Sequence, residues 1–150
     1  MENYDAEMAA RVWKRVRGEA DAEPPRMGIQ GLAAAEWAES AVYLMLSRQL
    51  QGREKAVLRQ LFEEERTHAD CLKGMHLLTT GKPLALRTPP PSPETPELAL
   101  RKCYARTLRA LKEYESRQDD PEYGHVFRHL AEEERKHCTV ILELVGGMKR

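Results

Sequence analysis

Two copies of a short acidic motif contain the residues of this chain that are best suited to chemistry. The stretch LFEEERTH at residues 61–68 recurs as LAEEERKH at residues 130–137, 69 positions later. Each copy ends in Glu-x-x-His, Glu65 with His68 and Glu134 with His137. Residues three apart on a helix share one face, so a carboxylate and an imidazole can reach the same point. Carboxylate oxygen and imidazole nitrogen suit Fe(II), Mn(II) or Zn(II), and spacing does not choose among these metals.

The flanking residues put both motifs inside an apolar seam, the stripe of residues that faces the neighbouring helices. Counted by heptads, Glu and His occupy positions that otherwise carry apolar side chains. The alternative is a solvated charged face, which is how we interpret the adjacent Glu63, Glu64, Glu132 and Glu133. Two copies in the same register favour the inward-facing interpretation. The apolar seam residues are Leu58, Leu61, Leu72 and Met75 in the first copy and Phe127, Leu130, Ile141 and Leu144 in the second.

The elements that must position these motifs are helices. A helix from about residue 27 to 51 carries Glu36 and Glu39 on its seam, and Gly52 permits a tight turn into the first motif helix, residues 53–79. The short connection forces the two helices antiparallel. Counted from that turn, Glu36 lies at the level of the first motif. Residues 27–80 are therefore predicted to form a helical hairpin.

A second hairpin follows a proline-rich segment at residues 81–96, which is predicted to be an extended crossover because proline fixes φ and removes backbone donors. Thr95-Pro96-Glu97 resembles the start of a helix, and Asp120-Pro121-Glu122 repeats that signal before the second motif helix. The last helix is expected to close at Gly146-Gly147. The prediction is a single all-α domain, an antiparallel four-helix bundle with its second hairpin at residues 97–147. A short accessory helix in residues 1–20 is expected to dock on the body or on a second subunit.

Composition restricts the classes of partner. The 150 residues carry 24 basic and 24 acidic side chains, and this net charge of zero argues against nucleic acid or an anionic membrane as the main partner. Apolar stretches fall short of a membrane span, and the first residues are acidic and polar, unlike a secretory signal. Three cysteines without a Cys-x-x-Cys pattern give neither a disulfide framework nor a zinc or iron site of that kind. We expect a cytoplasmic protein.

Two Glu-x-x-His helices, each preceded by a hairpin partner, resemble the ferritin-like di-iron carboxylate proteins, and rubrerythrins most closely. The resemblance covers roughly residues 27–147. In rubrerythrins a ligand Glu of the first helix is followed seven residues later by Tyr, and Glu36 and Tyr43 match that pattern. The resemblance implies a non-haem centre of two iron ions that reduces peroxide or oxygen. Its ligands would be Glu36, Glu65, His68, Glu134 and His137.

The third helix departs from the rubrerythrin pattern. Sliding the first hairpin onto the second by 68 residues pairs Glu39 with Thr107 and puts Tyr104 where the counterpart of Glu36 is expected. No acidic residue occupies the seam of this helix, so the bridging carboxylate is absent. Glu39, one turn from Glu36, is the candidate replacement. It brings the carboxylates to about four, the charge that two divalent cations need in a low-dielectric core.

Several other residues are candidates for supporting roles. Tyr43 and Tyr104 are predicted either to be core aromatics or to hydrogen-bond a ligand carboxylate and deliver a proton, and Tyr104 is also a candidate direct ligand. The three cysteines are interpreted as small buried fillers rather than reactive thiols. The remaining histidines are interpreted as surface or hydrogen-bonded. These residues are Cys71, Cys103 and Cys138, with His76, His125 and His129.

Two functions from different classes follow. The first is a rubrerythrin-like oxidoreductase, a homodimer that receives electrons from an external donor protein, because no rubredoxin domain is found in these residues. The second is a non-catalytic metal-binding or structural bundle whose degenerate site holds one metal, zinc, or only a polar core. Manganese or zinc are alternatives to iron in either case.

Overall fold

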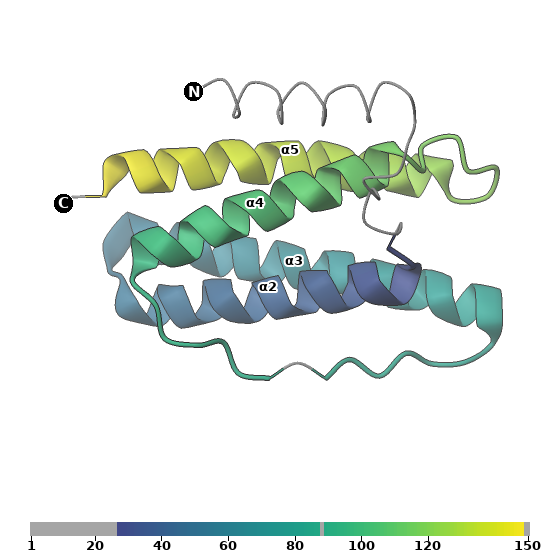
Figure 1. Cartoon of the computed structure of the whole chain (residues 1–150), viewed down its shortest axis with the longest axis horizontal. Coiled ribbons are helices and arrows are strands. Elements are labelled where there is room, and N and C mark those ends of the chain that lie inside the picture. Colours follow the sequence, from purple (N-terminus) through teal and green to yellow (C-terminus); the bar gives the residue numbers. More distant parts are fainter. Residues whose placement is uncertain (1–26, 88, 149–150) are drawn as a thin grey trace, which may run out of the picture.

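The computed structural model describes residues 27–87 and 89–148, and these form four helices and no strand. The predicted accessory helix at residues 1–20 lies outside the described residues. This element content confirms the all-helical prediction. The helices are joined by short turns within each pair (Figure 1). Their bounds are α2 Ile29–Gln49, α3 Gly52–Thr80, α4 Pro96–Glu115 and α5 Gly124–Gly147.

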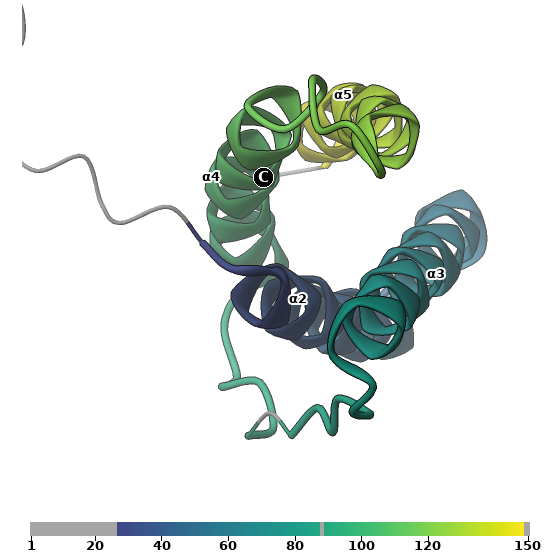
Figure 2. The same ribbon diagram turned by 90° about the vertical axis from the view of Figure 1, so that its right-hand side faces the viewer.

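The two hairpins lie side by side around a shared interior. Viewed end-on, the four helices occupy the corners of a bundle, with α2 beside α4 and α3 facing α5 (Figure 2). The segment between α3 and α4 runs along α2 from one end of the molecule to the other (Figure 1). Leu84 and Leu86 of this segment pack on the core, and Pro91 lines a pocket together with Val42 and Met45 of α2.

The ends of the helices follow the turn chemistry of the sequence. Gly52 and Gly81 have φ of 62° and 73°, a left-handed conformation that a side chain would strain. Thr95 caps α4 by accepting the Leu98 N–H at 3.4 Å. The predicted start of the last helix at Asp120 was wrong. Asp120 Oδ1 instead accepts the N–H groups of Glu122 and Tyr123 at 3.0 and 2.7 Å, which closes a turn, and α5 begins at Gly124.

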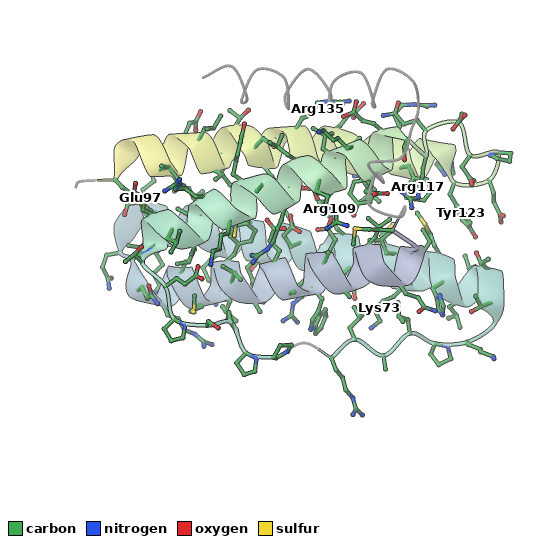
Figure 3. All side chains as sticks on the ribbon, viewed as in Figure 1. Lys73, Glu97, Arg109, Arg117, Tyr123 and Arg135 are labelled. Carbon is green, nitrogen blue, oxygen red and sulfur yellow. The ribbon has the colours of Figure 1, made fainter. Side chains whose placement is uncertain are left out.

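Ion pairs and ring contacts fix the helices at their ends and along their outer faces. Arg117 lies just beyond α4 (Figure 3), where it pairs with Glu113 at 2.6 Å and donates to the carbonyl of Met27. On the outer face of the first hairpin, the Arg66 guanidinium lies 3.6 Å from the centre of the Trp37 ring. These contacts hold α2 against both α3 and the α4–α5 turn.

The core consists of two apolar clusters separated by a polar layer. Every helix passes from one cluster, through this layer, to the other. Full burial of a leucine stabilises the fold by about 2 kcal/mol, so the clusters can offset the cost of polar groups between them. One cluster contains Tyr43, Leu46, Leu58, Leu61, Ala99, Leu100, Cys103, Ile141 and Leu144. The other contains Leu32, Ala33, Leu72, Met75, Tyr114, Phe127, Leu130 and Ala131.

Two predicted burials need correction. The seam of α4 was expected to contain Tyr104, but Cys103 is fully buried there and Tyr104 is only partly buried. Cys71 was interpreted as a buried filler, yet it is exposed on α3, while Cys103 and Cys138 are buried as predicted. On α3 the predicted seam is buried as expected and Cys71 lies beside it, whereas α4 is rotated slightly from the phase that the heptad pattern indicated.

None of the four described helices is both long and apolar enough to cross a membrane.

Candidate metal centre

Four acidic and imidazole side chains converge in the polar layer. Glu65, His68, Glu134 and His137 each offer one ligand atom, and these atoms all lie within 4.8 Å of one another. Each of these four residues is at most 4% exposed to solvent. This confirms that a buried Glu/His cluster able to hold a metal ion forms where the repeated motif predicted one.

Helices α3 and α5 run antiparallel, so the two motifs face each other in opposite directions. The glutamate of one motif therefore faces the histidine of the other: Glu65 Oε1 lies 2.7 Å from His137 Nδ1, and Glu134 Oε1 lies 3.2 Å from His68 Nδ1. Within each motif the carboxylate and imidazole are also close, at 3.9 and 3.7 Å. The two imidazole rings stack with centroids 5.4 Å apart. Both rings present Nδ1 to the carboxylates.

Several polar side-chain atoms of the layer, including one of Glu36 on α2, have no hydrogen-bond partner among the described residues. They are Glu36 Oε2, both carboxylate oxygens of Glu65, and His137 Nδ1. The 2.7 Å approach of His137 Nδ1 to Glu65 Oε1 lacks the alignment of a hydrogen bond. A buried polar atom without a partner costs about 1–3 kcal/mol, and more if charged. A cation among these atoms would satisfy their lone pairs, so the donor set fits a divalent metal.

Glu36 and Glu39 of α2 lie in the same layer but in different surroundings. Glu36 Oε2 is 3.5 Å from His68 Nδ1, and its other oxygen accepts the Tyr114 hydroxyl at 2.5 Å. Glu39 Oε1 accepts two hydroxyls, from Tyr43 at 2.8 Å and from Thr107 at 2.9 Å. Glu36 therefore points a free oxygen at the cluster, whereas Glu39 lies beside it with one oxygen already bonded.

The charge state of this layer reflects its burial. Burial and the charges of Glu36 and Glu134 raise the pKa of Glu65 well above its usual range. Burial raises the pKa of Glu39 to about 8, helped by the charges of Glu36 and Glu134. Burial also opposes ionisation of Glu36, but Glu65 and His68 outweigh it and lower the pKa of Glu36 to about 2. Without a cation, the layer must therefore keep carboxyls protonated.

His68 supplies positive charge to the layer. Burial lowers its pKa, but hydrogen bonds and charges from Glu134 and Glu36 outweigh burial and raise the pKa to about 10. A bound cation would replace both this proton and those held by the carboxyls.

One supporting residue was missed by the sequence analysis. Glu64 was interpreted as part of a solvated face, but it is only partly exposed and its Oε2 lies 2.8 Å from His137 Nε2. A carboxylate oxygen accepts, so His137 Nε2–H donates to Glu64 and Nδ1 faces the cluster. Such an outer hydrogen bond fixes the tautomer and orientation of a ligating histidine. The only sequence feature that could have indicated this role of Glu64 is its position directly before Glu65.

The tyrosines that hydrogen-bond to carboxylates of the polar layer are not the two that the sequence indicated. Tyr43 donates to Glu39, and Tyr114, which was not a candidate site residue, donates to Glu36. Within the described part of the chain, Tyr104 makes no hydrogen bond to the polar layer and packs beside an apolar cluster. Thr107, which the 68-residue shift aligns with Glu39, donates a hydrogen bond to it. Helix α4 thus contributes hydroxyl groups to the layer and no carboxylate.

Comparisons of this chain with protein-family models, curated proteins and solved structures find no match. Its function is therefore inferred from the geometry of these side chains.

Proposed function

We propose that this chain is a rubrerythrin-like, ferritin-like di-iron protein that reduces peroxide or oxygen with electrons from an external donor protein. The observation that supports this most directly is the convergence of Glu65, His68, Glu134 and His137 within 4.8 Å, with both Glu65 oxygens and His137 Nδ1 lacking hydrogen-bond partners. Four buried ionisable groups without a counter-ion would be costly in an apolar bundle.

The proposed ligands are the four convergent residues with Glu36 and Glu39. Glu36 already directs Oε2 at His68. Glu39 completes about four negative charges, which balance two divalent cations. Iron is the expected metal, and manganese and zinc accept the same oxygen and nitrogen ligands.

Iron bound here would supply the electrons and an open coordination position for peroxide or oxygen. The chain itself orients the ligands and excludes water. The Tyr114 hydroxyl fixes Glu36 through Oε1, and Glu64 holds His137 with Nδ1 inward. The Tyr43 hydroxyl, 2.8 Å from Glu39, is placed to hold or deliver a proton at that carboxyl. The apolar clusters cover both ends of the layer.

A second candidate is a non-catalytic metal-binding bundle. The observation that favours it is the composition of α4, whose polar-layer groups are the hydroxyls of Thr107 and Tyr114. Without a carboxylate from this helix, the layer has ligands for one metal ion more readily than for two. That ion would stabilise the bundle, as structural zinc does in other folds.

The two candidates are separated by metal analysis followed by peroxide addition. Protein produced with iron and purified without oxygen should contain about two irons per chain, consume peroxide and develop a near-ultraviolet band from oxidised iron. One zinc ion, or no metal, would contradict the oxidoreductase. Stoichiometric zinc without peroxide consumption would support the structural alternative. A homodimer is part of the proposal and is tested on the same sample by sedimentation.

A further inference from the structure

A groove of approximately 760 Å³ lies between α3 and α5 and reaches the polar layer at His137. Figure 2 shows these two helices facing each other on one side of the bundle. His137, one of the four convergent residues, lines this groove. The apolar clusters cover both ends of the layer, and the α3–α5 groove provides an approach to it from solvent at His137.

The lining of this groove is net acidic. Its carboxylates outnumber its cations, which raises the local concentration of small cations and disfavours anions. The apolar part of the wall, including Leu61 and Leu144, belongs to the core cluster. The charged lining residues are Glu54, Glu64, Glu133 and Glu143 against Arg53 and Lys136.

Two of these carboxylates meet at the inner end of the groove. Glu64, Glu133 and His137 offer ligand atoms within 4.8 Å of one another, a second group outside the buried one. Glu64 and Glu133 are partly buried, whereas their neighbours Glu63 and Glu132 are exposed. His137 is 1% exposed and belongs to both groups: Nε2 faces Glu64, and Nδ1, without a hydrogen-bond partner, faces the buried carboxylates.

We propose that Glu64 and Glu133 form an outer divalent-cation site through which ions pass along the α3–α5 groove to the buried centre. The inference rests on the proposed function, because that centre is the destination of the ion. A neutral imidazole has one lone pair, so His137 can serve the outer or the inner group but not both at once. An ion that moves inward takes Nδ1, and Nε2–H then donates to Glu64. The outer site is therefore a transit position rather than a third permanent one.

The test measures how fast metal-free protein takes up Co²⁺, whose visible absorption reports entry into a protein site. Glu133→Lys reverses a charge at the outer site, and Glu132→Lys makes the same change one residue away on the exposed face of α5. Stopped-flow mixing should show loading slowed on the order of tenfold in Glu133→Lys, with Glu132→Lys within about twofold of the original chain. Glu133→Gln should slow loading to an intermediate extent and guards against misfolding of the lysine variant.

The final cobalt content and spectrum should be the same in all four proteins. Equal loading rates for Glu133→Lys and Glu132→Lys would overturn the transit site while leaving the proposed function intact. A lower cobalt content in Glu133→Gln at an unchanged rate would make Glu133 a permanent ligand and also overturn it. Failure of the original chain to bind Co²⁺, Fe²⁺ or Zn²⁺ would remove the proposed function and this inference together.

Discussion

Glu65 of α3 and His137 of α5 lie with Oε1 and Nδ1 2.7 Å apart, both fully buried and without hydrogen-bond alignment. Two acceptors at this distance repel each other unless a proton or a cation lies between them or beside them. The pair comes from opposite copies of the repeated motif, so the contact is formed only when the two hairpins associate. Metal binding and bundle stability should therefore be coupled.

Replacement of Glu65 by Gln should separate these two effects. Because burial keeps Glu65 protonated in the metal-free protein, a neutral amide should change metal-free stability by less than about 1 kcal/mol. The original chain should gain about 2.7 kcal/mol at a metal concentration of 100 Kd, a rise in Tm of about 5–10 °C. Glu65→Gln should lose most of that rise in a thermal scan, and Glu63→Gln on the exposed face should keep it. An undiminished rise in Glu65→Gln would contradict its role as a ligand.

Metal-free protein should become less stable as the pH rises above about 5. The pKa of Glu39 is raised from 4.5 to about 8, so its stabilising protonated form is complete below pH 4.5 and is lost as the pH rises through 8. The pKa of His68 is raised from 6.5 to about 10, so its contribution is complete below pH 6.5 and is lost through 10. Both groups lower Tm in the same direction.

Chemical denaturation at several pH values checks this expectation. Glu39→Gln, which has no proton to lose, should flatten the decline between pH 5 and 8, and saturating metal should remove it in the original chain. Glu36 acts in the opposite sense, because its pKa is lowered from 4.5 to about 2 and its contribution is lost only in acid. Identical pH profiles for Glu39→Gln and the original chain would rule out the assignment to Glu39.

Loss of the Tyr114 hydroxyl should weaken both the fold and the site. Tyr114→Phe leaves the buried Glu36 Oε1 without its donor, which costs about 1.5–3 kcal/mol for a hydrogen bond to a charged group. Metal affinity should fall about 10-fold to 100-fold, because Glu36 is no longer oriented. Tyr104→Phe is the matched control, with an expected change within about 0.5 kcal/mol. A larger loss of stability and metal affinity in Tyr104→Phe than in Tyr114→Phe would show that Tyr104, and not Tyr114, supports the site.

Glu64 should affect metal affinity through His137. Glu64→Ala removes the acceptor 2.8 Å from His137 Nε2 and frees the imidazole to change tautomer, so the affinity for Zn²⁺ should fall about tenfold or more. Glu63→Ala makes the same truncation on the exposed side of α3 and should leave the affinity unchanged. Competition with a chromophoric chelator measures both. Equal affinities in the two variants would show that Glu64 does not position His137.

The sequence by itself determined the helices, the two hairpins and the ionisable groups of the polar layer. Heptad spacing is a local property, because residues three and four apart share a helix face whatever the rest of the chain does. Glu65, His68, Glu134 and His137 therefore had to lie on the faces that carry the leucines around them, and all four are buried. Turn glycines at residues 52 and 81 were equally readable, since positive φ favours glycine.

Only the tertiary structure decided which neighbours these groups meet. Successive residues differ by about 100° around a helix, so a residue beside the seam, such as Glu64, faces solvent or another helix according to how that helix is rotated. The rotation of α4 likewise buried Cys103 in place of Tyr104 and brought Tyr114 to Glu36 of the other hairpin. These contacts join residues far apart in the chain, and a periodic pattern within one helix carries no information about the rotation of its partner.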